Sequence, residues 1–289
     1  PAKREQKGGP ALRTYLNQLQ TILDDGVTKG DRTGVGTISY FGLQARYNMA
    51  DGFPAVTTKK LVWKSMVSEL LWFISGSDNL RDLKDIYKYN KLWDANYEDY
   101  VHRRNGTDNG DMGRVYGVQW RRWRGFDGTE TDQLSEAIDL IRHNPDSRRI
   151  IVNAWNPAEA SPDHVALPPC HSFFQFHVAD GRLSLQMYQR SADMFLGVPL
   201  NIASYALLLH MVANLTGLEA GDFIHSIGDA HIYLNAIDQV HEQLSRDPLP
   251  LPSLSIADRG QTSIDDFVMD DFALEGYESH PSLKATMAV

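Results

Sequence analysis

The chain has 289 residues, of which 42% are hydrophobic and 22% charged, and its formal net charge is −9 at pH 7. This length suits one large domain or two small ones, and the charge argues against a general attraction to nucleic acid. A single cysteine excludes an internal disulfide and a thiolate metal site, so no metal is expected. No apolar run approaches the roughly 18 residues of a membrane helix. Nothing indicates export, and we therefore expect a reducing, cytoplasmic environment.

In chain order, residues 1–10 (PAKREQKGGP) are polar, lack an apolar signal core and are predicted to form a flexible end. The segment SMVSELLWFISG (65–76) predicts a buried helix that ends near Gly76. The segment GRVYGVQWRRWRG (113–125) mixes arginines with aromatic residues. An exposed basic loop with its tryptophans anchored in the core is favoured there over a nucleic-acid patch.

The second half predicts a helix and turn over 131–147, a β-branched strand over 148–155, and a hairpin over 172–191 that turns at Asp180-Gly181. Residues 201–217 predict an apolar helix ended by Gly217, residues 229–248 an amphipathic helix, and PLPLPSL (248–254) a break. Strands and helices alternate without clean βαβ spacing. We therefore expect an α/β (α+β) fold, a single domain with a mixed, twisted β-sheet packed by helices.

The lone Cys170 lies in ALPPCHSFFQF (166–176), between a proline pair and His171, just before a predicted strand. From the residues alone it is either an inert buried hydrophobe or a nucleophile that a loop presents. A reactive thiolate needs a nearby cation to lower its pKa, and arginine can serve because it stays charged. Separation along the chain does not identify which arginine approaches it.

Several long segments resemble the signature segments of the thymidylate synthase family. They are LPPCH, QMYQRSADMFLGVPLNIASYALL, GDAHIYLN, DRTGVGT, FPAVTTKK, ELLWFISG, VYGVQWR, DSRRIIVNAWNP and HPSLKATMAV. The resemblance implies a catalytic domain over residues 11–289 and a homodimer that meets through a sheet face. It also implies methylation of the uracil of dUMP at C5, with 5,10-methylenetetrahydrofolate supplying the carbon and the hydride.

The chemistry of that reaction suits the residues that match. A Cys170 thiolate that adds to uracil C6 turns C5 into an enolate carbon, and the resemblance places Arg190 near the sulfur and on the phosphate. Asn201 would donate to O4 and accept from N3–H, whereas cytosine presents the reverse pattern. The alternative role of Asn201 is a plain helix N-cap.

Proton transfer is assigned to three further residues. Glu69 lies among leucines, where a carboxyl group has a raised pKa or pairs with a cation, and the resemblance makes it a general acid/base. The resemblance places Tyr116 near the C5 proton, and His171 corresponds to the histidine that follows the nucleophile.

The dianionic phosphate needs several fixed donors, and the resemblance supplies Arg32, Arg190 and Ser191, with Arg148 and Arg149 from the partner subunit. It also implies that His231 and Tyr233 hold the 3′-hydroxyl, although residues at i and i+2 do not share a helix face. The folate site and its border with the nucleotide are assigned by resemblance to Lys59, Trp93, Asp193, Leu196, Gly197, Leu200 and Val289.

Three positions differ from the common family pattern. Leu200 replaces a phenylalanine, Arg114 a proline before VYG, and Thr286 a proline near the C-terminus. A dUMP 5-hydroxymethylase is the nearest alternative, since water instead of hydride would attack the same intermediate; Trp93 and a full-length tail favour hydride. A non-catalytic nucleotide- or RNA-binding homologue is the other alternative, and the net charge disfavours RNA.

Overall fold

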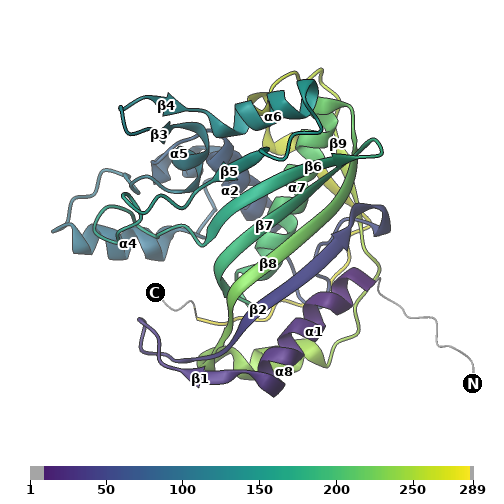
Figure 1. Ribbon diagram of the computed structural model, residues 1–289. Helices are drawn as coiled ribbons and strands as arrows, with labels where there is room; N and C mark the ends of the chain where they lie inside the picture. Colours follow the sequence, from purple (N-terminus) through teal and green to yellow (C-terminus); the bar gives the residue numbers. More distant parts are fainter. Residues whose placement is uncertain (1–9, 287–289) are drawn as a thin grey trace, which may run out of the picture.

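A six-stranded mixed sheet organises the structure, a computed structural model that describes residues 10–286 (Figure 1). The strands in spatial order are β1 (Val27–Lys29), β2 (Thr37–Asn48), β8 (Glu219–Tyr233), β7 (Arg182–Asp193), β6 (His171–Ala179) and β5 (Ile151–Asn153). Neighbours are antiparallel except β7 and β8, which pair in parallel and are joined by helix α7 (Val198–Thr216). The expected α/β fold, a mixed sheet packed by helices in one domain, is confirmed.

The remaining elements are short and surround this sheet. The helices are α1 (Pro10–Asp25), α2 (Trp63–Ile74), α3 (Leu80–Ile86), α4 (Asp94–Arg103), α5 (Tyr116–Arg121), α6 (Gln133–His143) and α8 (Ile237–Leu244). Two small sheets pair β3 (Trp123–Arg124) with β4 (Glu130–Thr131), and β9 (Ser253–Ile256) with β10 (Phe272–Glu275). Single 3-10 turns cover Met49–Asp51, Leu234–Ala236, Ile264–Asp266 and Met269–Asp271.

Helix α7 is the centre of the core. It lies behind β7 and β8 in Figure 1 and contacts α2 on its other side. By length and composition alone it could cross a membrane, which corrects the expectation that no apolar segment approaches that length. Because 72% of the apolar window is buried inside the fold, we assign α7 as a core helix. It begins after Gly197, so the N-cap role for Asn201 is wrong, and it ends at Gly217 in the left-handed region (φ 68°).

Elements with strong local signals form where the sequence predicts them. Helix α2 ends at Ile74, two residues before Gly76, and Asp132 caps α6 by accepting from Ser135 N–H. The β6–β7 hairpin turns at Asp180 (φ 51°) and Gly181 (φ 73°), as the two positive angles of a type I′ turn require.

Two predicted segments need correction. Residues 229–233 belong to β8, where all five pair with β2 and residues 229–231 also pair with β7, and only Ile237–Leu244 of the predicted amphipathic helix is α-helical. Partners on both sides outweigh the local helical pattern. Within the expected basic loop, Tyr116–Arg121 form helix α5 and Trp123–Arg124 form β3, with Trp120 almost fully buried (1% exposed). The predicted flexible end, 1–10, lies outside the described residues except for Pro10, which begins α1.

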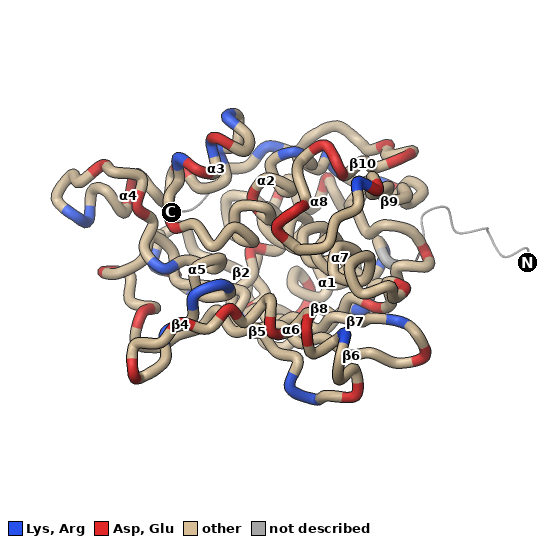
Figure 2. Tube along the Cα trace, turned by 90° about the horizontal axis from the view of Figure 1, so that it is seen from above, with Lys and Arg blue, Asp and Glu red and all other residues tan. Residues whose placement is uncertain are grey.

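The sheet face opposite α7 is mixed in character. One row of paired positions holds Ile151, Gln175 and Gln186, and a second holds Phe173 and Tyr188, whose rings stack at 5.8 Å. Ile151 and Phe173 are 38% and 39% exposed. Figure 2 shows acidic and basic positions interspersed along the trace.

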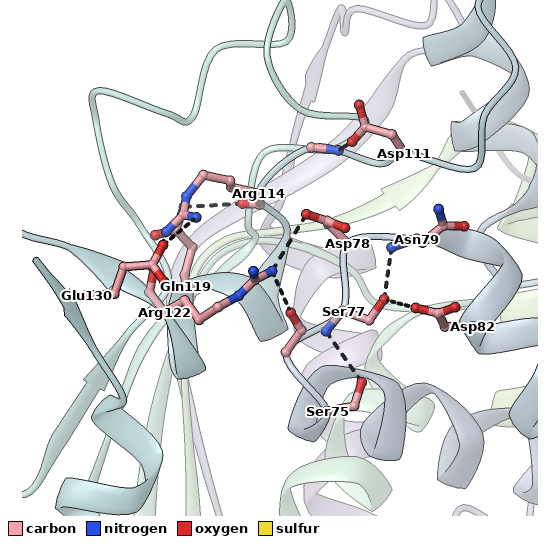
Figure 3. Close-up of polar contacts among 12 residues, drawn as sticks. Ser75, Ser77, Asp78, Asn79, Asp82, Asp111, Arg114, Gln119, Arg122 and Glu130 are labelled. Carbon is pink, nitrogen blue, oxygen red and sulfur yellow. Dashed lines mark hydrogen bonds and ion pairs between the residues drawn. The ribbon is translucent and has the colours of Figure 1, made fainter. Parts of the chain in front are cut away.

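Arg114 belongs to a polar network that ties the loop before α5 to its surroundings (Figure 3). Its Nε lies 2.7 Å from Glu159 Oε2, and its carbonyl accepts from Gln119. Nearby, Arg122 donates to the carbonyl of Gly76. Burial raises the pKa of Glu159, but hydrogen bonds from Gln119 and Arg114 outweigh it and hold that pKa below its ordinary value. A proline at position 114 has no such side chain, so this network is specific to the observed arginine.

We expect Arg114→Met to destabilise the protein by about 1 kcal/mol at pH 7, because the half-buried Glu159 carboxylate loses the nearer of its two ionic partners, Arg114 and Arg124. The folded-state pKa of Glu159 is depressed, so its stabilisation is present above the unfolded-state pKa and is lost as pH falls. Urea denaturation at pH 7 and pH 4 measures the effect, which should shrink at pH 4. The double variant Arg114→Met/Glu159→Gln should recover most of the loss; an equal loss at both pH values contradicts an ionic origin.

Candidate active site

One cleft of about 870 Å³ collects nearly all of the predicted site residues. It opens where α2, the start of α7 and the carboxyl ends of β7 and β8 meet the loop that holds Cys170. The predicted residues that line it are Arg32, Lys59, Glu69, Trp93, Tyr116, Cys170, His171, Arg190, Ser191, Asp193, Leu196, Gly197, Leu200, Asn201, His231 and Tyr233. Arg148 and Arg149 are exposed in the turn after α6 and do not line it, and Val289 lies outside the described residues.

Cys170 immediately precedes β6, and backbone hydrogen bonds on both of its sides hold it there. Its backbone N–H donates to Tyr116 Oη at 2.8 Å, and its carbonyl accepts from Arg190 N–H at 2.8 Å. The Arg190 guanidinium donates to the carbonyls of Pro168 and Pro169, each at 2.9 Å, and Nη2 lies 3.8 Å from Cys170 Sγ. The proline pair thus presents two carbonyl groups that fix the guanidinium beside the sulfur.

A nearby arginine was expected to lower the pKa of the Cys170 thiol, but the net shift of that pKa is upward. Burial raises the pKa of Cys170, whereas Arg190 and the Tyr116 hydroxyl act to lower it. Burial is the larger effect, so the thiol in this structure is not pre-ionised. Arg190 is nevertheless the arginine that approaches the sulfur, which the sequence alone left open.

Glu69 faces the same cleft from α2. Burial raises its pKa to about 7, and a hydrogen bond of 2.6 Å from Trp93 Nε1–H to Oε1 partly offsets that rise. The indole of Trp93 is itself fixed, because it packs edge-on against Trp72 and Phe73. A carboxyl group with a pKa near neutrality can both release and accept a proton, as a general acid/base must.

Trp93→Phe is expected to raise the pKa of Glu69 further, since the indole N–H stabilises the carboxylate. The ionisation seen in the pH profile of kcat should move upward by about one pH unit. Trp72→Phe is the matched control, because the Trp72 N–H donates to the carbonyl of Asn79 and not to a carboxylate. If the wild type, Trp93→Phe and Trp72→Phe have the same pH profile of kcat, the Trp93 N–H does not lower the pKa of Glu69.

Asn201 lies in the first turn of α7, and its Oδ1 accepts from Gln189 Nε2 at 3.2 Å. Burial lowers the pKa of His171 to about 4, although a hydrogen bond with Asn201 offsets part of this. His171 is therefore neutral near pH 7. The Asn201 amide thus sits between two neutral polar side chains at the floor of the cleft.

Two arginines from distant segments, Arg32 and Arg190, line the cleft. Arg32 lies in a turn that Asp31 organises by accepting from the N–H groups of Thr33 and Gly36. Arg190 Nη1 makes no hydrogen bond within the described residues, and Ser191 lies next to it on β7. Free guanidinium and hydroxyl donors in one cleft suit a phosphate.

His231 and Tyr233 are on strand β8, not on a helix. Alternate residues of a strand share a face, so their i, i+2 spacing does bring them together. Their rings meet edge-on at 5.2 Å, and His231 Nδ1 lies 3.3 Å from Asp229 Oδ1. The pair therefore presents two polar groups on the same wall of the cleft.

The cleft also has apolar lining at the start of α7, next to a carboxylate and a lysine. Leu196 and Leu200 from the start of α7 face it, and Asp193 Oδ1 accepts from the N–H groups of Phe195 and Leu196, each at 2.9 Å. Lys59 is buried (8% exposed) with Nζ bonded to the Phe195 carbonyl and 3.7 Å from the ring centroid. Burial lowers the pKa of Lys59 to about 8, so it is not an ordinary surface lysine.

Sequence reasoning missed three residues that shape the site: Asp31, Gln189 and Asp229. Asp229 bonds Ser39 Oγ at 2.8 Å and contacts Lys29 and His231. An aspartate two residues before a histidine in a strand was an available signal for it. Gln189 had no signal, because its partners on three different elements are known only from the fold.

Fold and cleft together define an α/β protein whose one thiol lies beside a fixed guanidinium in a deep cavity with polar and apolar walls. No metal-binding group of His, Cys, Asp or Glu occurs within residues 10–286. The family model described as thymidylate synthase matches residues 13–289, and the chain therefore belongs to the thymidylate synthase family. Membership identifies it generally as a dUMP-methylating enzyme of dTMP biosynthesis, in a family whose co-substrate is methylenetetrahydrofolate.

Proposed function

We propose that this protein converts dUMP to dTMP by reductive methylation at uracil C5, with 5,10-methylenetetrahydrofolate converted to dihydrofolate. The observation that carries the proposal is the placement of Cys170 Sγ, 3.8 Å from Arg190 Nη2, in the same cleft as Glu69 and Asn201. Residues 11–289 act as one catalytic domain in this proposal, and the setting is cytoplasmic.

The nucleotide has a chemically matched position in this cleft. Its phosphate meets Arg32, Arg190 and Ser191, and its 3′-hydroxyl meets His231 and Tyr233. The Cys170 sulfur then adds to C6 of uracil. The thiol proton is released to water, and the electrons of the C5–C6 double bond move toward O4, which makes C5 electron-rich.

In this proposal, Asn201, Glu69 and Tyr116 stabilise the developing charge and transfer protons. Asn201 donates to O4 as negative charge develops there and accepts from N3–H. Glu69, with its pKa of about 7, exchanges protons with the O4 region. We assign Tyr116, whose hydroxyl accepts from the Cys170 N–H, to the side from which the C5 proton leaves.

The residues present fit a folate. The Trp93, Leu196 and Leu200 side chains provide apolar surface for flat rings, and Asp193 provides a carboxylate for N–H groups. Lys59 supplies positive charge toward the glutamate tail. When bound, the folate supplies one carbon and a hydride. Leu200 offers less ring contact than a phenylalanine would, and Val289 would close over the bound pair and exclude water.

The proposed enzyme is a homodimer. The sheet face opposite α7 carries the exposed Ile151 and Phe173 among neutral polar side chains, a mixture that suits a subunit interface. Arg148 and Arg149 lie on exposed backbone next to β5, at the edge of this face. Neither arginine lines the cleft of its own subunit, which is why we propose that they bind the phosphate in the partner subunit.

Product analysis with dUMP and methylenetetrahydrofolate tests the proposal. We expect dTMP in a one-to-one ratio with dihydrofolate, and a stable covalent complex at Cys170 when 5-fluoro-dUMP replaces dUMP, because fluorine cannot leave C5 as a proton does. Hydroxymethyl-dUMP without oxidation of the folate would instead identify the 5-hydroxymethylase. Steeply salt-dependent RNA binding without turnover would indicate the non-catalytic alternative.

A further inference from the structure

His225, in the middle of β8, is completely buried and takes no direct part in the proposed chemistry. Its Nε2 lies 2.8 Å from Gln189 Oε1 on the neighbouring strand, and its ring stacks on Phe223 at 5.7 Å. Burial, with a smaller effect of His171, lowers the pKa of His225 to about 3. The ring is therefore neutral near pH 7 and carries one N–H, on either Nδ1 or Nε2.

The hydrogen-bond partners decide which nitrogen holds the proton. Gln189 Nε2 lies 3.0 Å from the backbone carbonyl of Ser191, which can only accept, so the amide NH₂ must face it. The amide oxygen of Gln189 then faces His225, and only a proton on Nε2 can satisfy it. Nδ1 of His225 has no partner within the described residues, so a proton there would be buried and unpaired.

The same Gln189 amide determines the orientation of Asn201. Its NH₂ also lies 3.2 Å from Asn201 Oδ1, so the oxygen of the Asn201 amide is the atom that faces Gln189. If the Asn201 amide turned over, two NH₂ groups would face each other. The polar pattern that Asn201 offers to a ligand is therefore set by a chain that runs from β8 through β7 to α7.

We propose that His225 is a positioning residue: by donating to Gln189, it holds the Asn201 amide in the orientation that accepts uracil and rejects cytosine. This inference rests on the proposed function, in which Asn201 contacts O4 and N3–H of the base. Without the His225 donor, the Gln189 amide oxygen would be buried and unpaired. Apart from Asn201, the Gln189 amide would then be fixed only by its hydrogen bond to the Ser191 carbonyl. Discrimination between the two bases should then fall.

The test compares His225→Met with His225→Gln in the full chain. The glutamine amide nitrogen is as many bonds from Cβ as His Nε2, so it can replace the donor, whereas methionine has similar length and no donor. The readout is the ratio of the dissociation constants for dCMP and dUMP, measured by calorimetry. We expect His225→Met to lower this ratio about fivefold to tenfold, and His225→Gln to keep it near the wild-type value.

Other outcomes separate the inference from the function on which it rests. An unchanged ratio in His225→Met, or equal weakening of both nucleotides, overturns the positioning role. A wild-type protein that binds dCMP as well as dUMP overturns the base-reading role of Asn201, and this inference with it. If His225→Met does not fold, ¹H–¹⁵N spectra of the wild-type histidines decide: a proton on Nε2 of His225 at pH 7 supports the proposal, and one on Nδ1 overturns it. The His225→Gln variant assigns the signal.

Discussion

Cys170→Ser is expected to abolish dTMP formation, with a fall in kcat of at least about 10⁴-fold, while dUMP still binds. A serine hydroxyl stays protonated under conditions in which a thiol beside a guanidinium can ionise, so the bond to C6 does not form. The phosphate and sugar contacts proposed for Arg32, Ser191 and His231 do not depend on the sulfur. Steady-state assay of dTMP together with calorimetric titration of dUMP measures both parts.

The control for this variant is its fold and its covalent chemistry. Thermal unfolding should match the wild type closely, because serine is nearly isosteric with cysteine. Peptide mass spectrometry after treatment with 5-fluoro-dUMP and the folate should find the nucleotide on the Cys170 peptide of the wild type and none on the variant. Wild-type turnover in Cys170→Ser would remove the basis of the covalent mechanism.

The parts of the fold that could be read from the sequence are those fixed by local chemistry. Helices α2 and α6 carry their own apolar faces and end signals, and the Asp180-Gly181 turn defines its hairpin. The long strand β2 and the end of β8 were not predicted. They pair with each other over Thr37–Asn48 and Asp222–Tyr233, and no local pattern announces a partner so distant in the chain.

The candidate site likewise combines residues that the sequence identifies with contacts that only the fold determines. The resemblance supplied the identity of residues such as Cys170 and Arg190, but the reason they act together comes from the fold. Carbonyl groups of the Pro168–Pro169 pair hold the guanidinium against the sulfur, and burial works against ionisation of the thiol. Together these effects leave the pKa of Cys170 raised, because burial outweighs Arg190 and the Tyr116 hydroxyl. Sequence segments cannot reveal this balance because it depends on burial.

If the enzyme is a homodimer with shared phosphate sites, replacing Arg148 and Arg149 should greatly reduce activity. Arg148→Glu/Arg149→Glu should lower kcat/KM for dUMP by about 10²-fold to 10³-fold, because two donors to the phosphate become two repelling charges. If these arginines serve the partner subunit, co-expression with Cys170→Ser should restore activity. Each heterodimer then has one site with both lesions and one with none, and random assembly gives about a quarter of wild-type activity.

The matched control is a mixture of Cys170→Ser with Glu69→Gln. Both of these side chains line the same cleft of one chain, so every site in that heterodimer lacks one of them and no activity should return. Restored activity in the arginine mixture but not in this control requires that Arg148 and Arg149 act across the interface. Failure of both mixtures would show that Arg148 and Arg149 do not act across the interface. The cleft described for a single chain would then need another source for the positive charge that a dianionic phosphate demands beyond Arg32 and Arg190.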